Sequence, residues 1–423
     1  MSTGVINLTS FEITRFLLAF LLLLAGAHVL GFVFQHFRLP RVIGEIAGGF
    51  IFGPTLLGLI RPDIYQNLFA AFPSEGALIS GLYWAGLVLL MFISGFEIKR
   101  TVGRQDLKLI LAILVGGTLL PFYFGLFGLP FFNFTDLVGQ AGNILALKII
   151  VGIAIAVTSI PVISKIFIDL GLAHTRFAKV VIASATIEDV LLWTALSVAT
   201  SLVTGNELSG AGLVGKVFVT ILFFGLGLWL IPKLLTLVNH SRYNFIFKSS
   251  TIGYSLTICF LLVALADLLE VNLVFGALLA GIIIGSQTDP RIESARHLIK
   301  EVALASFVPL YFAIVGLKLD LVHHFSLSLF LVFLIFATLI KITGTMLGAR
   351  LAGQSFLPSL NLGLAMNARG GPGIVLATIT FEAGIINEFF FTTLILTAIV
   401  TSLVAGRWLG LVNEHKWPLL DAQ

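Results

Sequence analysis

The sequence predicts an all-α integral membrane protein with about thirteen transmembrane helices, and three observations support this prediction. Hydrophobic residues make up 58% of the 423 residues and charged residues only 11%, with a mean hydropathy of +1.07. Soluble domains average about 45–50% apolar and 25% charged residues. Apolar stretches of about 17–25 residues, long enough to cross a bilayer as helices, follow one another along the chain. Two of these stretches contain helix-breaking residues near their centres.

The expected helices are these apolar stretches taken in order. They are centred on residues 16–35, 42–60, 78–96, 109–129, 145–168, 178–203, 213–235, 250–268, 272–286, 302–317, 327–349, 360–380 and 389–411. The first contains LLLLAGAH, which is similar to a signal-peptide cleavage region. It lacks a positively charged n-region and its apolar run continues to Phe34, so we expect a retained helix.

The distribution of basic residues predicts the orientation of the helices. With thirteen helices the two termini lie on opposite sides, and 18 of the 25 Lys and Arg residues fall in loops on one side against five on the other. Cytoplasmic loops carry the excess of basic residues. We therefore expect an outside N-terminus and a cytoplasmic C-terminus in a bacterial cytoplasmic (inner) membrane. The net charge of +4 comes from these loops, and no basic cluster interleaved with aromatics indicates a nucleic-acid partner.

The chain reads as a single transmembrane domain over residues 1–423, without a cytosolic regulatory domain. About a dozen residues follow the last apolar stretch, and no polar loop exceeds about 20 residues. Cys259 is the single cysteine and has no His nearby, and there is no HExxH motif. We therefore expect no disulfide within the chain, no cofactor and no enzymatic activity.

The fifth stretch, LKIIVGIAIAVTSIPVISKIFIDL, predicts a broken helix. Thr158, Ser159 and Pro161 lie at its centre. Proline removes a backbone donor and clashes with the preceding turn, so the helix should break or kink just before it. A kink in which Thr and Ser satisfy the freed carbonyls is the structural alternative.

The sixth stretch carries two adjacent acidic residues, Glu188 and Asp189, in the middle of an otherwise apolar helix. An Asp at the centre of a membrane helix costs about 2.5–3.5 kcal/mol even on the milder scales, so such residues indicate an ion or proton pathway. Consecutive helical residues point about 100° apart, so the two acids should meet different neighbours.

The eleventh and twelfth stretches supply the basic counterparts. Lys341 lies within the eleventh, and Arg369 precedes Gly370, Gly371 and Pro372 in the ARGGPG motif of the twelfth, which makes a continuous helix implausible. We expect Lys341 to pair with an acid and Arg369 to anchor the broken region. The two breaks lie seven helices apart, as in an inverted repeat, although the repeat is visible in hydropathy and breaks only. A buried ion-pair network that merely holds helices together is the alternative.

These residue types suit exchange of a monovalent cation for protons. A hard cation prefers carboxylate and carbonyl oxygens, and a broken helix frees carbonyls around Thr158. Carboxylates removed from water bind protons more readily, so cation and proton can compete for one group. One of the two acids, Glu188 or Asp189, is the candidate ligand for Na+ or K+, and the other is expected to meet a basic partner.

Several motifs, in order, resemble those of the monovalent cation:proton antiporter-2 family, which includes Kef-type and NapA-type proteins. They are RLPRVIGEIAGGFIFGPTLLG (38–58), GLVLLMFISGFEIK (86–99), VTSIPVISKIFIDLGL (157–172), ASATIEDVLLW (183–193), VFGALLAGIIIG (274–285), FVPLYFAIVGLKLDL (307–321) and MNARGGPGIVLA (366–377). The resemblance implies a homodimer with crossed discontinuous helices. It implies dimerisation helices at about 11–98 and 250–320, and core helices at about 108–203 and 326–412.

The resemblance also implies roles for individual residues. Asp189 matches the ion-binding aspartate, Thr158 the unwound-helix residue, and Lys341 the intramembrane lysine that pairs with the position of Glu188. Glu188 departs from the Asp, Asn or Gln usual there, which leaves the stoichiometry open. We expect a secondary active antiporter that exchanges Na+ or K+ for protons by alternating access. A Kef-type K+ efflux pathway with channel-like transport and an organic-anion symporter of related fold are the alternatives.

Overall fold

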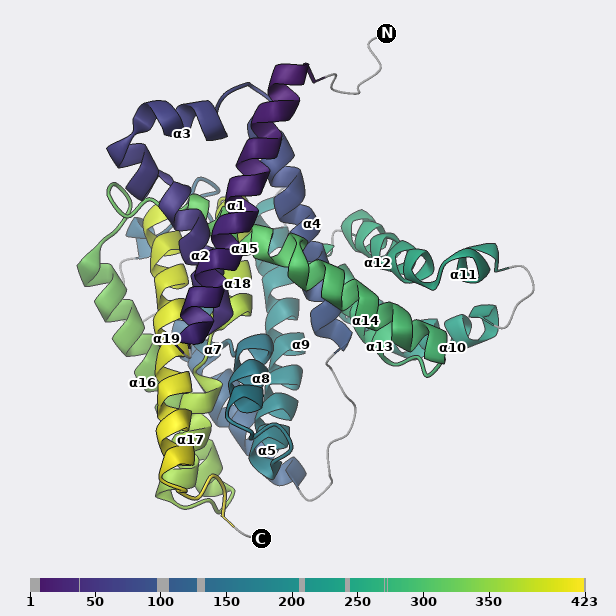
Figure 1. Cartoon of the computed structure of the whole chain (residues 1–423). Coiled ribbons are helices and arrows are strands. Elements are labelled where there is room, and N and C mark those ends of the chain that lie inside the picture. The colour runs from purple at the N-terminus through teal and green to yellow at the C-terminus, as the bar shows by residue number, and fades with distance from the viewer. Residues whose placement is uncertain are drawn as a thin grey trace. The chain divides into compact units, whose positions relative to one another are not determined.

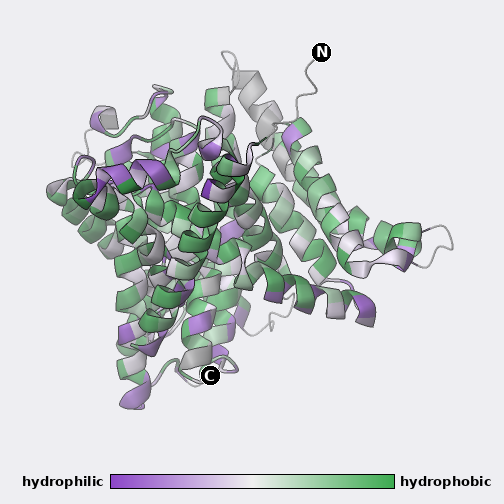
Figure 2. Ribbon diagram, turned by 45° about the horizontal axis from the view of Figure 1, so that its top comes forward, coloured by the Kyte–Doolittle hydropathy of each residue, from purple (hydrophilic) through white to green (hydrophobic). Residues whose placement is uncertain are grey.

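The computed structural model describes residues 8–37, 39–96, 106–127, 134–204, 210–239, 244–269, 271 and 273–421. Of the described residues, 82% are helical, and no strand occurs among them, only an isolated bridge between Val138 and Ile386. Figure 2 shows hydrophobic residues along most of the helical ribbon. The predicted all-α, multi-pass class is therefore confirmed. The basic loops at 97–105 and 240–243 lie outside the described residues.

Nine helices among the described residues are long and apolar enough to cross a membrane, and three apolar helices are shorter. The shorter ones are Ile144–Ala156, Leu273–Gly285 and Phe356–Met366. Two of the three belong to the stretches that the sequence predicts to be broken. The number thirteen stays a prediction, because it counts each broken stretch as one span.

The chain forms two compact units, Met1–Leu90 with Lys300–His323, and Met91–Ile299 with His324–Gln423. In the first, α1 and α15 both pack against α2. The elements of this unit are α1 (Ser10–His36), α2 (Arg41–Phe52), the π-helical turn η1 (Pro54–Gly58), α3 (Pro62–Phe69), most of α4 (Glu75–Phe96) and α15 (Phe307–Leu317) (Figure 1). Helix α14 (Pro290–Ala305) begins in the second unit and ends in the first.

The second unit holds all the ionisable residues that the sequence singles out. Its elements are α5 (Leu107–Leu114), the π-helical turn η3 (Val115–Leu119), α6 (Leu120–Leu126), the 3-10 turn η4 (Phe134–Asp136), α7 (Ile144–Ala156), α8 (Ile160–Asp169), α9 (Arg176–Thr204), α10 (Gly210–Asn239), α11 (Phe245–Ser249), α12 (Thr251–Leu268), α13 (Leu273–Gly285), α16 (Leu327–Leu351), α17 (Phe356–Met366), α18 (Gly370–Glu382) and α19 (Glu388–Glu414). The helix α9 packs against α5, α7, α8 and α17, and α16 packs against η3, α7, α17 and α19.

Two of the predicted helices are each divided into a pair of half helices. The fifth stretch is α7 followed by α8, with residues 157–159 outside any helix, and Pro161 is the second residue of α8. A proline there needs no helical donor, so the second half can begin where the first cannot continue. The twelfth stretch is α17 followed by α18, separated by Asn367–Arg369.

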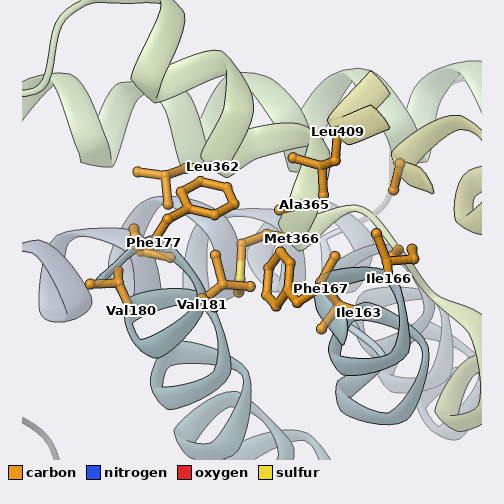
Figure 3. Packing of buried hydrophobic residues seen from close by; sticks show 14 of the residues in the cluster. Ile163, Ile166, Phe167, Phe177, Val180, Val181, Leu362, Ala365, Met366 and Leu409 are labelled. Carbon is orange, nitrogen blue, oxygen red and sulfur yellow. The ribbon is translucent and has the colours of Figure 1, made fainter. Parts of the chain in front are cut away.

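An apolar cluster fixes the half helices α8 and α17 within the second unit. Ile163 and Phe167 of α8 and Leu362 and Met366 of α17 are buried in it (Figure 3), with side chains of α5, α9 and α19. Lipid tails are as apolar as these residues, so close van der Waals packing rather than removal from water holds such helices together.

The segment after α19 returns to the start of α17. Ser355 is the N-cap residue of α17, and its own side chain makes no capping bond. The carboxylate of Asp421 accepts hydrogen bonds from the backbone N–H of Ser355 and, at 2.9 Å, from its Oγ. Asp421 therefore caps α17 from a distant part of the chain, next to a helix N-terminus that favours negative charge.

Candidate functional site

The candidate site lies where α9, α16 and the two helix breaks meet in the second unit. Glu188 and Asp189 are in the middle of α9, Lys341 is in the middle of α16, and Arg369 lies between α17 and α18. The side chains of Glu188 and Lys341 are fully buried, and those of Asp189 and Arg369 nearly so. All four ionisable residues that the sequence placed at mid-membrane therefore occupy the interior of one unit.

The C-terminal end of α7 is covered by the two basic side chains. The last carbonyls of a helix have no partner within it, and at membrane depth no lipid can supply one. The Nζ of Lys341 donates to the carbonyl of Ala156, the last residue of α7. Arg369 donates from Nε to the carbonyl of Ala154 at 3.0 Å and from Nη2 to that of Ile155 at 3.1 Å. Positive charge at this end also interacts favourably with the negative C-terminal end of the helix dipole.

Arg369 has further hydrogen bonds that tie the second break to α16. Its Nη2 also donates to the carbonyl of Ala337 at 2.9 Å, and its Nη1 donates to Asn367 Oδ1 at 2.8 Å. The guanidinium thus holds α7, α16 and the α17–α18 break together through neutral oxygens. The sequence predicts that Arg369 anchors the broken region, and these hydrogen bonds show which elements it contacts there.

The two breaks are hydrogen-bonded to each other. The hydroxyl of Thr158 donates a hydrogen bond to the carbonyl of Met366. The backbone N–H of Ser159 donates to the carbonyl of Ala368, and both distances are 2.6 Å. Ser159 Oγ accepts the backbone N–H of Val162 at 3.3 Å and caps α8. The carbonyls of Met366 and Ala368 and the N–H of Ser159 therefore find partners across the two breaks, as irregular backbone buried in protein requires.

The beginning of α18 explains the residue types of the ARGGPG motif. Gly370 has a φ of +34°, and a Cβ there would approach the Val162 side chain closely. Its N–H donates to Ser402 Oγ of α19 at 3.0 Å. Gly371 and Pro372 complete the first turn, where the missing N–H of proline removes no helical bond.

Glu188 is held by two donors on one oxygen. Its Oε2 accepts from Lys341 Nζ at 2.7 Å and from Thr118 Oγ1 at 2.6 Å. Its Oε1 has no hydrogen-bond partner among the described residues. The sequence expected the partner Lys341 but did not single out Thr118, which is buried on η3 some seventy positions earlier in the chain.

The position of Thr118 follows from a π-helical turn and a close backbone contact. The N–H of Leu120 bonds to the carbonyl of Val115, five residues back, just before Pro121. The ring of a proline inside a helix displaces the carbonyl four residues earlier, which favours such a wider turn. Gly116 meets Gly344 of α16 backbone to backbone, because a Cβ on either would overlap the carbonyl of the other. The motif GGTLLP was the available sequence signal.

Asp189 has a different environment from its neighbour. It lines a cavity of about 10 Å³, on the scale of one water molecule, with Val157 of the first break and Pro372 of the second. The remaining lining is apolar, with Trp193 on the next turn of α9. Asp189 Oδ1 accepts no hydrogen bond from any described residue. Of the two acids, Asp189 is the one that lines the cavity, next to both half-helix junctions.

The arrangement separates a fixed charge pair from an available carboxyl group. The pair Glu188–Lys341 and the bonds of Arg369 hold the breaks, and Asp189 borders the cavity. Thr158 and Ser159 lie beside Val157 at the break, with the hydroxyl proton of Thr158 committed to Met366. Within the described residues, no group of three or more His, Cys, Asp or Glu side chains is placed to hold a metal ion.

Comparisons with known proteins give consistent results along the whole chain. The model of the family described as "Sodium/hydrogen exchanger, transmembrane" matches residues 13–414. The sequence is 26% identical over 390 residues to a "Na(+)/H(+) antiporter" from Enterococcus hirae, covering 91% of this chain and 94% of that protein. It is 27% identical over 423 residues to "K(+)/H(+) antiporter 1" from Saccharomyces cerevisiae, covering 97% of this chain and 47% of that protein, so this chain spans about half that relative's length.

The fold is similar to a solved structure, that of the sodium proton antiporter MjNhaP1 from Methanocaldococcus jannaschii. The TM-score is 0.68 at 16% sequence identity, and the match covers 95% of this chain and 98% of that one. At this identity the likeness concerns the fold alone. It agrees with the helical architecture described above.

Proposed function

Because this chain belongs to the family of transmembrane sodium/hydrogen exchangers, we propose that it exchanges Na+ or K+ for protons with Asp189 as the shared binding group. One observation carries the choice of Asp189. Asp189 is the acid that lines the cavity, whereas Glu188 does not line it and accepts hydrogen bonds from Lys341 and Thr118. One carboxylate that binds either a proton or a cation couples the two movements, because each ligand displaces the other.

The helix breaks would complete the cation site. A dehydrated monovalent cation needs several oxygens, and unwound backbone beside a cavity supplies them in transporters of this kind. We propose that Thr158 and Ser159 contribute oxygens next to Asp189. The cavity lined by Val157 and Pro372 supports this, because it adjoins both breaks. Lys341 and Arg369 act as charge partners that keep the broken region in place.

We further propose alternating access in a homodimer of thirteen-helix chains with two crossed discontinuous helices. Helices at about 11–98 and 250–320 would form the dimer part, and those at about 108–203 and 326–412 the moving core. The hydrogen bonds between the two breaks support a crossing, and the compact unit of residues 1–90 and 300–323 supports a separate dimer part. The excess of basic residues on one side supports a cytoplasmic C-terminus in a bacterial inner membrane.

The substitution Asp189→Asn tests the proposal in everted membrane vesicles. It removes the charge at nearly constant volume, so cation-induced dissipation of the pH gradient should fall to background for Na+ and K+ alike. Thr378→Val is the matched control, because Thr378 is fully buried and its hydroxyl donates only to the carbonyl of Ile374 on its own helix. A near-wild-type response from Asp189→Asn would contradict the proposal.

The two alternatives make different predictions. An organic-anion symporter would need a cationic group free to bind a carboxylate, yet Arg369 donates four hydrogen bonds to protein oxygens. A channel-like K+ efflux pathway would conduct without obligatory proton coupling. Exchange measured in proteoliposomes with Na+, K+ and Li+ under an imposed voltage separates these cases and reports ion selectivity.

A further inference from the structure

We propose that residues 305–307 form a hinge between α14 and α15, and that His28 of α1 is the positioning residue that holds this hinge. The inference rests on the proposed function, because alternating access requires some helices to change direction during the cycle. The chain passes from the second compact unit into the first along α14. Neither the hinge nor His28 borders the cavity of Asp189.

The helix that the sequence predicts at 302–317 is interrupted at Ser306. The helix α14 ends at Ala305 and α15 begins at Phe307. Between them Ser306 has a φ of −135° and a ψ of −76°, which lies outside the helical region. Its Oγ donates to the carbonyl of Val302 at 2.6 Å, within the last turn of α14. The chain therefore leaves the helical conformation at a single residue.

Pro309 leaves the carbonyl of Ala305 without its helical donor. In a continuous helix the N–H of residue 309 would bond to this carbonyl, four residues earlier, and proline has no N–H. Because Pro309 lies in the first turn of α15, that helix itself loses no bond. The Nε2 of His28 donates to the carbonyl of Ala305 at 2.9 Å. A side chain of α1 thus replaces the missing backbone donor.

The ring of His28 is held in the tautomer that this bond requires. Arg41 Nη2 lies 2.9 Å from His28 Nδ1. A guanidinium only donates, so Nδ1 accepts and the ring proton is on Nε2, which faces Ala305. Arg41 is in turn paired with the buried Glu45 of α2, with Nε 2.9 Å from Oε1. A Cβ at Gly31 would lie 3.2 Å from the Arg41 side chain, so the glycine gives Arg41 room beside α1.

The two helices that meet at the hinge are held to different extents. The buried helix α15 meets α2 backbone to backbone, because a Cβ at Gly49 would overlap the carbonyl of Ala313. A Cβ at Gly316 would likewise overlap the carbonyl of Ile46. In contrast, no other described element packs extensively against α14, and Val302 on its last turn is exposed. Motion should therefore concentrate at the few residues that join the fixed helix to the less constrained one.

Hydrogen exchange of the purified protein in detergent tests the hinge without requiring transport. His28→Phe keeps a ring and removes the donor, so the amides of residues 302–306 should exchange about two- to tenfold faster, as expected for loss of one hydrogen bond. His28→Gln should restore slow exchange, because its amide offers an acceptor to Arg41 and a donor to Ala305. Pro232→Ala, which removes the proline inside α10, is the control and should leave these amides unchanged.

A double substitution separates the hinge from the pairing of Arg41. In a Pro309→Ala background the N–H of residue 309 can bond to the carbonyl of Ala305, so His28→Phe should accelerate amide exchange no further. Equal acceleration in both backgrounds, or none in either, would overturn the inference. If His28→Phe is not recovered folded, His28→Leu is compared with His28→Gln in the same way.

Cation/proton exchange in proteoliposomes measures what the hinge contributes to transport. Pro309→Ala favours a continuous helix by about one hydrogen bond, so the maximal rate should fall about two- to tenfold. The half-saturating cation concentration should stay the same, because Pro309 does not border the cavity of Asp189. An unchanged maximal rate would refute the part that the hinge plays in exchange. Wild-type protein that exchanges no cation, with the amide results as expected, would instead refute the proposed function.

Discussion

Two neighbouring carboxyl groups of α9 have different surroundings, and this difference defines the site at the scale of single residues. Glu188 is bonded to Lys341 and Thr118, and Asp189 borders a small cavity. Because consecutive positions of a helix point about 100° apart, one helix can present one acid to each environment. Two acids that are adjacent in sequence therefore lie in two different environments.

Replacing one member of the buried pair Glu188–Lys341 should lower the free energy of unfolding more than replacing both. Lys341→Ala leaves Glu188 buried without its cation, which costs about 3–5 kcal/mol. The double variant Glu188→Gln, Lys341→Gln should recover much of this, because no net charge remains unpaired. Thermal unfolding in detergent measures the effect, with the exposed Lys233→Ala as control. Equal melting temperatures for Lys341→Ala and the double variant would contradict this reading.

At this scale the sequence indicated the ionisable residues but not their neutral partners. An intramembrane Asp, Glu, Lys or Arg is conspicuous because burying its charge is costly, so Lys341 could be predicted as the partner of an acid and Arg369 as the anchor of the broken region. A threonine carries no such signal in a chain with many threonines in helices. The role of Thr118 depends on a contact between residues seventy positions apart, which no local pattern specifies.

Half helices and a π-helical turn position these residues at the scale of elements. The two half-helix pairs could be expected from Pro161 and from the GGPG sequence, because proline and glycine act through the local backbone. The π-helical turn could not be expected so directly, since Pro121 alone is equally compatible with a kink. Its register is fixed by the contact between Gly116 and Gly344, which belongs to tertiary structure.

The contact between η3 and α16 predicts the effect of a single methyl group. Gly116→Ala places a Cβ against the carbonyl of Gly344, so the two elements must separate. Overpacking of this kind costs about 1–3 kcal/mol, and exchange should fall because Thr118 and Lys341 no longer meet at Glu188. Thermal stability and proteoliposome exchange measure the two effects. Gly81→Ala, where the added methyl meets no atom, is the control; equal behaviour of both variants would contradict the argument.

At the scale of the whole molecule, the predictions of fold class and orientation came mainly from hydropathy and the distribution of charge. The all-α multi-pass class follows from composition and segment length, and the family assignment agrees with it. The number of spans is harder to predict, because half helices of 10–13 residues are too short to count as spans by length alone. The proposed dimer interface is also hard to locate from sequence, because apolar residues between two membrane proteins resemble those that face lipid.

The predicted orientation has a direct test by cysteine labelling. Cys259 is buried and should react slowly, so the labelling of an introduced cysteine can be compared with the low background labelling of Cys259. Asn67→Cys on α3 should react with a membrane-impermeant maleimide in intact cells, because that loop is predicted outside. Glu414→Cys at the exposed end of α19 should react only after permeabilisation. The opposite pattern would show that the orientation is the reverse of the predicted one. Labelling of both positions in intact cells would contradict an odd number of spans between them.

The capping of α17 by Asp421 has a consequence for the order in which the protein is made. Ribosomes add about 5–20 residues per second, and Asp421 is added after α17, α18 and α19 have all been synthesised. The half helix α17, in which the carbonyl of Met366 accepts a hydrogen bond from Thr158, therefore obtains this cap only after α19 has been synthesised. Until then the second break lacks part of its support. We therefore expect assembly of the candidate site to be completed only after the residues that follow α19 have emerged.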